Sequence, residues 1–203
     1  MDGAGTVGSR AAGGSRVSVR ALVLVAIVAL VVLGLDQLAK AWVVNNLTPG
    51  KLVQVIGELL QFEFVKNSGA AFSLASGSTW IFSIIATVVV VFIIWFARRI
   101  RSVGWAILFG MLLGGTVGNL LDRFFREPSF GLGHVVDFIR IPLLPAIFNL
   151  ADVAICASMA LFVILTLLGI GLDGSRTRRV HADSIPPEAP SETVSAPQPN
   201  DRG

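Results

Sequence analysis

Long apolar stretches without a single charged side chain constrain this sequence more than any other feature. They run over residues 21–35, 67–97, 102–121, 141–151 and 153–172. A helix needs about 20 mostly apolar residues to cross the hydrocarbon core of a bilayer. Divided at that length, the sequence predicts four transmembrane helices, over residues 21–44, 78–97, 103–121 and 147–170. We therefore expect an all-α integral membrane protein.

The composition agrees with a membrane protein. Of the 203 residues, 54% are hydrophobic and 14% are charged, whereas a soluble domain carries about 25% charged residues. We do not expect the first span to be a cleaved signal peptide, because its apolar core is too long and it contains Asp36 and Lys40. The single cysteine, Cys156, lies inside the fourth span and excludes an intrachain disulfide.

Arginines flank the predicted spans in three clusters. The clusters are Arg10, Arg16 and Arg20 before the first span, Arg98, Arg99 and Arg101 between the second and third, and Arg176, Arg178 and Arg179 after the fourth. Positive charges next to spans are retained on the cytoplasmic side. The clusters therefore predict that both termini are cytoplasmic. The positive charges, which leave a net charge of +3, are thus explained by membrane topology and do not indicate binding of nucleic acid.

Two tails and two outer loops complete the predicted organisation. Residues 1–16 and 173–203 are rich in small and polar residues, so we expect disordered cytoplasmic tails around a membrane domain. The outer loop 45–77 contains two alternating runs separated by a glycine, which predict a small extracytoplasmic β-hairpin. The outer loop 122–146 contains a short β-like run around Val135–Ile139.

Helical spacing makes two further predictions. Gly110, Gly114 and Gly118 recur at every fourth residue of the third span, and small residues at this spacing let two transmembrane helices approach closely. If the fourth span begins at residue 147, Asp152 lies roughly 7–9 Å below its start, at 1.5 Å per residue. That depth is reachable from the outer surface.

The polar residues of the membrane region gather in one layer. With the predicted topology, the outer ends of the spans and their loops carry Asp36, Lys40, Asn67, Asn119, Asp122, Arg123, Asp137, Asn149 and Asp152, together with Gly69 of the segment "NSGAAF" (67–72). A carboxylate in such apolar surroundings is costly unless it is paired, protonated or used in chemistry. The layer therefore predicts a functional site near the outer face.

Some of these acids have a structural interpretation as well. Asp36 and Lys40 are four residues apart with the acid first, the favourable order for an ion pair within a helix. Asp122 is expected to pair with Arg123 or Arg126, or to lie in the membrane interface. An ion pair and a place in the site do not exclude each other.

Three kinds of hydrolytic chemistry come into question at this layer. A serine activated by a lysine would use Ser68 or Ser73 with Lys40 or Lys66, but no spacing favours that arrangement. A metal site would depend on carboxylates with at most one histidine. Two aspartates held close enough to share a proton can polarise a water molecule for attack on an amide. The aspartate pair is the interpretation we favour.

Five short motifs resemble signal peptidase II, the lipoprotein signal peptidase family of bacterial inner membranes. They are "DQLAK" (36–40), "NSGAAF" (67–72), "GGTVGNLLDR" (114–123), "GHVVDF" (133–138) and "FNLAD" (148–152). Each motif alone is weak, but the five in this order, over roughly residues 20–170, are highly specific. The two tails lie outside the resemblance.

The resemblance implies an aspartyl endopeptidase that cleaves diacylglyceryl-modified prolipoproteins just before the lipidated cysteine. It implies Asp137 and Asp152 as the catalytic pair and no metal or organic cofactor. The supporting residues that it implies are Asp36, Asn67, Asn119, Arg123 and Asn149, to which we add Lys40, Gly69 and Asp122 from the same motifs. The hairpin region 47–66 would form an outer β-structure resting on the membrane. We expect a monomer in the bacterial cytoplasmic membrane, surrounded by lipid.

Two other classes of protein were weighed against an enzyme. A small transporter or a proton-conducting subunit would also place aspartates in a membrane, but it would need polar residues through the whole membrane depth. The inner halves of the four spans are instead almost entirely Val, Ile, Leu, Ala and Phe. A structural scaffold would leave the buried acids unexplained. A site on one face favours the enzyme.

Overall fold

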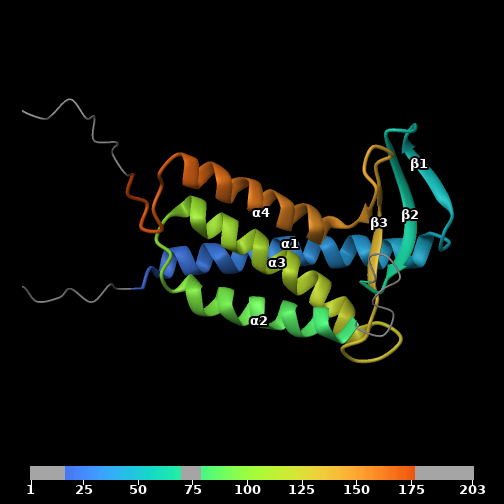
Figure 1. Ribbon diagram of the computed structural model, residues 1–203, viewed down its shortest axis with the longest axis horizontal. Coiled ribbons are helices and arrows are strands. Elements are labelled where there is room, and N and C mark those ends of the chain that lie inside the picture. Colours follow the sequence, from blue (N-terminus) through green and yellow to red (C-terminus); the bar gives the residue numbers. More distant parts are fainter. Residues whose placement is uncertain (1–16, 70–78, 177–203) are drawn as a thin grey trace, which may run out of the picture.

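The computed structural model describes residues 17–69 and 79–176. It contains four α-helices, α1 (Val19–Asn46), α2 (Thr79–Ala97), α3 (Val103–Phe125) and α4 (Leu150–Leu167), and four β-strands, β1 (Leu52–Ile56), β2 (Leu60–Asn67), β3 (Val135–Arg140) and β4 (Ile147–Phe148). The helices form a bundle, and the strands gather at one end of it (Figure 1). The described ends of the chain lie at the opposite end.

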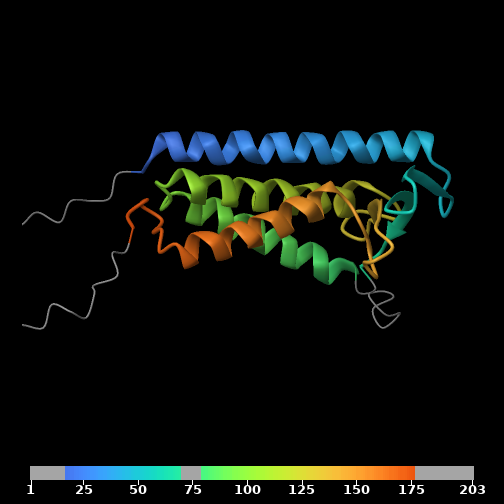
Figure 2. The same ribbon diagram turned by 90° about the horizontal axis from the view of Figure 1, so that it is seen from above.

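Helix α3 is the centre of the bundle, because it packs against α1, α2 and α4 (Figures 1 and 2). All four helices are long and apolar enough to cross a membrane. The most apolar window of α3 has the lowest mean hydropathy, 1.5 against 2.3 to 2.7 for the others. This difference is expected of a helix that faces protein more than lipid.

Glycines let α3 approach its neighbours closely. A Cβ atom at Gly114 would lie 2.6 Å from the backbone oxygen of Ala29 in α1, and one at Gly110 would lie 2.6 Å from the Cβ of Val28. On another face of α3, a Cβ at Gly115 would lie 2.6 Å from the backbone oxygen of Ala151 in α4. The tight packing predicted from the glycine spacing is confirmed, with α1 as the partner of Gly110 and Gly114.

The fourth helix is shorter than predicted. It begins at Leu150, not at residue 147, because Ile147 and Phe148 pair with β3 and Asn149 caps the helix with its side chain. It ends at Leu167, shortly before Gly169, whose φ of 64° leaves the helical region. Residues 147–170 are mostly apolar on both sides of the two helix ends, so composition alone did not reveal where the helix begins and ends.

The strands form one antiparallel sheet in the order β1-β2-β3-β4. The predicted hairpin is present as β1 and β2, and the β-like run of the second outer loop is present as β3. The all-α class is not confirmed, because β3 lies between β2 and β4 and joins both outer loops into a sheet. Buried backbone N–H and C=O groups need hydrogen-bond partners, and β3 supplies partners to β2.

The sheet is attached to the bundle by a small apolar cluster. Val43 of α1 is fully buried against Phe64 of β2 and against Val136 and Phe138 of β3. The side chain of Asp137, between these two β3 residues, points to the other face of the strand. The cluster thereby fixes the side from which Asp137 faces the helices.

At the opposite end, a turn after α4 closes the bundle. The backbone oxygen of Leu172 accepts hydrogen bonds from the N–H groups of Arg101 and Ser102, and Ile170 pairs with Arg176. Residues 173–176, which the sequence assigns to a disordered tail, belong to this turn. The rest of that predicted tail, the predicted tail 1–16 and residues 70–72 of the "NSGAAF" segment lie outside the described residues.

Candidate active site

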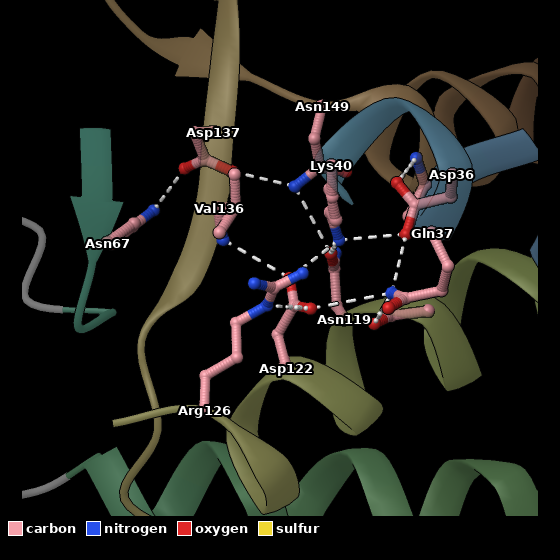
Figure 3. A network of polar contacts seen from close by, with 12 residues as sticks. Asp36, Gln37, Lys40, Asn67, Asn119, Asp122, Arg126, Val136, Asp137 and Asn149 are labelled. Atoms are coloured by element: carbon pink, nitrogen blue, oxygen red, sulfur yellow. Dashed lines mark hydrogen bonds and ion pairs between the residues drawn. The ribbon is translucent and has the colours of Figure 1, made fainter. Parts of the chain in front are cut away.

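The residues predicted for the site come together where the sheet meets the bundle. Asp137 lies on β3 and Asp152 in the first turn of α4. Asp36 and Lys40 lie near the end of α1 that faces the sheet, and Asn119, Asp122 and Arg123 lie near the same end of α3 (Figure 1). Asn67 ends β2, and Asn149 precedes α4. Figure 3 shows the side chains of Asp137, Asn67, Asn149, Asn119, Lys40, Asp36 and Asp122 directed toward one another.

Asp137 is almost fully buried and receives two amide hydrogen bonds. Its Oδ2 accepts from Asn67 Nδ2 at 2.7 Å and its Oδ1 from Asn149 Nδ2 at 2.6 Å (Figure 3). Burial raises the pKa of Asp137 to about 6, although the two amide donors and Lys40 oppose the shift. The negative charge of Asp152 raises this pKa further. The carboxyl group therefore keeps its proton to a higher pH than an ordinary aspartate.

Asp152 is held by the start of its own helix. Its Oδ2 accepts from the backbone N–H of Asn149 at 3.1 Å, and its own N–H donates to Asn149 Oδ1 at 3.0 Å. This reciprocal pair is a capping box, which also explains why α4 starts here. Asp152 is the third residue of α4, so it lies roughly 3–5 Å from the helix start, and the 7–9 Å expected from the sequence is wrong.

Asn149 joins the two aspartates. This fully buried residue caps α4 next to Asp152 and donates its amide N–H to Asp137. Asn119 completes the bridge, because its Nδ2 donates to Asp152 Oδ1 at 2.8 Å and its Oδ1 accepts from Asn149. Two neighbouring carboxyl groups that share one proton can act as acid and base on a single water molecule.

The loop after β2 is shaped by Asn67 and Gly69. The N–H of Gly69 donates to Asn67 Oδ1 at 2.7 Å, which leaves the amide nitrogen of Asn67 free to face Asp137. Gly69 has a φ of 84° and a Cβ there would approach Phe82 to 2.9 Å. A side chain would therefore meet both backbone strain and a clash at this position.

Arg123 supplies a cation beside the pair. Its guanidinium lies 5.2 Å from the centre of the Phe82 ring. Its Nη1 is the one buried side-chain nitrogen or oxygen without a hydrogen-bond partner within residues 17–69 and 79–176. A buried donor left without an acceptor is costly, so this N–H is well suited to a substrate oxygen.

Three charged side chains lie behind the pair. The Nζ of Lys40 is 2.8 Å from both Asp36 Oδ2 and Asp122 Oδ2, and all three side chains are fully buried. The predicted ion pair between Asp36 and Lys40 is confirmed. Asp122 also pairs with Arg126, at 2.6 Å, which decides between the two arginines considered for it.

Sequence reasoning missed two neighbours of these charges. Gln37 donates through Nε2 to Asp36 and to the backbone oxygen of Gly118. A Cβ at Gly118 would lie 2.6 Å from Asp36 Oδ2, so this glycine makes room for the carboxylate. Gln37 belongs to "DQLAK", and its position next to Asp36 was the available signal. No local signal placed Gly118 opposite Asp36.

Two alternatives fit this geometry less well. The three N–H groups of Lys40 are used by Asp36, Asp122 and Asn119, so this lysine offers no lone pair to a serine. In the part of the chain that the structure describes, no group of three His, Cys, Asp or Glu side chains could hold a metal ion. The aspartate pair is the arrangement best supplied with hydrogen bonds.

Comparison with known proteins identifies the family of this chain. The family model for signal peptidase (SPase) II matches residues 28–168. A lipoprotein signal peptidase of Leifsonia xyli subsp. xyli is 65% identical over 164 residues, which cover 81% of this chain and 76% of that relative. One from Mycolicibacterium smegmatis is 45% identical over 175 residues, covering 86% of this chain and 74% of that relative.

Two solved structures of bacterial membrane enzymes resemble this fold. A bacterial membrane enzyme determined by the in meso method at 1.9 Å resolution superposes with a TM-score of 0.63 at 26% identity, covering 70% of this chain and 92% of that one. A second, at 2.3 Å resolution, has a TM-score of 0.63 at 25% identity and covers 77% and 93%. The chain belongs to the signal peptidase II family, bacterial membrane proteases that remove signal peptides from prolipoproteins.

Proposed function

We propose that this protease is an aspartyl endopeptidase in which Asp137 and Asp152 together activate a water molecule. The observation that carries the proposal is the position of Asn149, which binds both aspartates and holds them as a pair. Burial of Asp137, with a pKa of about 6, favours a state in which the pair retains one proton. The ionised carboxylate then serves as base and the protonated one as acid.

The reaction follows from this shared proton. The ionised carboxylate takes a proton from water as the water oxygen attacks the scissile carbonyl carbon, and the protonated carboxyl group donates to the carbonyl oxygen. The tetrahedral intermediate collapses when the C–N bond breaks and the leaving nitrogen receives a proton from the pair. The unpartnered Nη1 of Arg123 supports a role in binding a substrate carbonyl oxygen near this centre.

The proposed substrates are diacylglyceryl-modified prolipoproteins, cut just before the lipidated cysteine. An apolar groove of about 580 Å³ lies between α1, the sheet and the start of α4, with Trp42, Phe62, Phe138 and Leu150 among its lining residues. Leu150 lines this groove and shares the first turn of α4 with Asp152, so acyl chains in the groove would lie beside the helix start that carries this aspartate. The groove has room for lipid and few groups that would favour a polar ligand.

The sheet is proposed to rest on the outer surface of the membrane. Every residue of β1 is exposed, and four of its five side chains, Leu52, Val53, Val55 and Ile56, are apolar. Exposed apolar side chains of this kind mark a membrane or protein contact. Contact with lipid would place the sheet, and the pair beside it, at the level where a lipid-modified cleavage site lies. We expect the protease to work as a monomer.

Replacement of each aspartate tests the proposal directly. Asp137→Asn and Asp152→Asn keep the size of the side chain but remove the proton-accepting carboxylate, so each variant should insert normally and lose nearly all turnover. The assay is incubation of purified protein with a lipidated prolipoprotein, with the released peptide followed by a gel shift. Asp173→Asn, an exposed acid at the other end of the bundle, is the matched control and should cleave normally. Near-normal turnover by either variant would remove that residue from the pair.

A further inference from the structure

The two buried acids behind the pair contact the backbone next to the two aspartates. Asp36 Oδ1 accepts a hydrogen bond from the N–H of Ala151 at 2.9 Å, and Ala151 directly precedes Asp152. Asp122 Oδ2 accepts from the N–H of Val136 at 3.1 Å, and Val136 directly precedes Asp137. Figure 3 shows the contact between Asp122 and Val136. Each buried acid thus holds the residue before one member of the pair.

Lys40 joins the two acids into one unit. Its Nζ lies between Asp36 and Asp122, and all three side chains are shielded from solvent. The outer end of α1, α3, β3 and the start of α4 are therefore linked by side-chain contacts through a single ammonium group. A displacement of β3 relative to α4 would have to break one of these contacts.

Lys40 also sets the direction of the amide hydrogen bonds. Its third N–H donates to Asn119 Oδ1 at 3.0 Å. An ammonium group only donates, so the oxygen of Asn119 must face Lys40 and its nitrogen must face Asp152. The same oxygen accepts from Asn149 Nδ2, which donates to Asp137 as well. A single donor thereby directs an amide N–H toward each aspartate.

We propose that Asp36, Lys40 and Asp122 are positioning residues that set the spacing and the hydrogen-bond donors of the aspartate pair. The proposal deepens the function proposed above and rests on it. A buried ion pair contributes little to stability compared with apolar residues of the same size. Apolar side chains could fill the same space in a membrane protein without loss of stability. The presence of three buried charges is therefore better explained by the geometry that they impose on the aspartate pair.

The test removes two of the three charges of the unit without leaving an unpaired charge. Asp36→Leu combined with Lys40→Met removes one negative and one positive charge, and Asp122 keeps its pair with Arg126. Loss of the contacts to Ala151 and Asn119 should lower kcat by about 100-fold, as a small misplacement of catalytic groups does, while KM changes little. Glu63→Gln with Arg140→Gln removes an ion pair of the same sheet and should leave both constants unchanged.

The pH profile separates positioning from mere stability. The charged groups around Asp137 are Asp152 on α4, Lys40 on α1, and Asp122 and Arg123 on α3. Removing the Lys40 cation should move both limbs of the kcat/KM profile to higher pH. All rates are expressed per molecule of folded enzyme, counted by titration with a tight-binding inhibitor.

Two results would overturn the proposal. One is a folded double variant with the kcat and the pH limbs of the parent enzyme. The other is a loss of total activity that is fully accounted for by a smaller amount of folded protein, with an unchanged rate per folded molecule. If this variant does not fold, Asp122→Leu with Arg126→Met removes the third residue of the unit together with its outside partner, and it should lower kcat in the same way. If neither folds, Asp36→Asn is measured, and an unchanged kcat and pH profile would equally overturn it. The proposed function is tested separately by Asp137→Asn and Asp152→Asn. If those two variants are inactive while one of the contradicting results is obtained, the proposed function stands and only this inference fails.

Discussion

The side chain of Asn149 is fully buried between the two aspartates, and its polar atoms have partners on both sides. Its oxygen caps α4 through the N–H of Asp152, and its nitrogen donates to Asp137 and Asn119. The same residue therefore serves the stability of a helix and the chemistry of the site. The two contributions can be separated by comparing different substitutions of Asn149.

Asn149→Ala should lose both contributions, whereas Asn149→Ser keeps an oxygen that can cap the helix. We expect Ala to lower stability by about 1 kcal/mol relative to Ser, and both variants to lose most activity. Ser18→Ala removes the cap of α1 instead and should cost similar stability with normal turnover. Thermal unfolding in detergent and the cleavage assay measure the two effects. An active Asn149→Ala would show that Asp137 does not depend on this donor.

The pH profile of the same variants has a definite direction. The pKa of Asp137 is raised to about 6, so the pair keeps its proton below that pH and loses it above. The high-pH limb of kcat/KM, which reports free enzyme, should lie near this value. The donated N–H of Asn149 lowers the pKa of Asp137, so both variants should move this limb to higher pH. A limb that stays in place would assign it to another group.

At the scale of elements, local patterns predicted the helices and strands but not how they join. Apolar length gave four helices, and alternation gave β1, β2 and β3. The pairing of Val65 with Asp137 and the two-residue strand β4 connect segments far apart in the sequence, so no local signal carries them. The same limit applies inside the site. The pair of Asp36 with Lys40 follows from helical spacing, while the contacts of these acids with Ala151 and Val136 do not.

The packing of α1 on α3 gives a prediction at this scale. Gly114→Ala would place a methyl group 2.6 Å from the backbone oxygen of Ala29, which has no side-chain freedom to move away. We expect a loss of about 1–3 kcal/mol, as in other overpacked interiors. Gly34→Ala in α1 is the control, because a Cβ there has no neighbour within 4 Å among the described residues. It should be neutral or slightly stabilising. Equal thermal midpoints for the two variants would contradict close approach at Gly114.

For the whole molecule, the distribution of charge predicts how the site faces the membrane. Arg20, Arg98, Arg99, Arg101 and Arg176 lie at the end of the bundle opposite the sheet, where α1 begins, α4 ends and α2 joins α3 (Figure 1). The aspartate pair lies at the other end. The positive-inside rule therefore predicts that the arginine end is cytoplasmic and that the pair opens to the outer side.

Accessibility of single cysteines tests this orientation in intact cells. With Cys156 first replaced by Ala, a membrane-impermeant thiol reagent should label a cysteine at Lys51 or Ser129, which flank the sheet. It should not reach one at Arg99, between α2 and α3, or at Ser184, beyond the described residues. Permeabilised cells supply the control, because all four cysteines should then react. The reverse labelling pattern would contradict the proposed orientation of the pair.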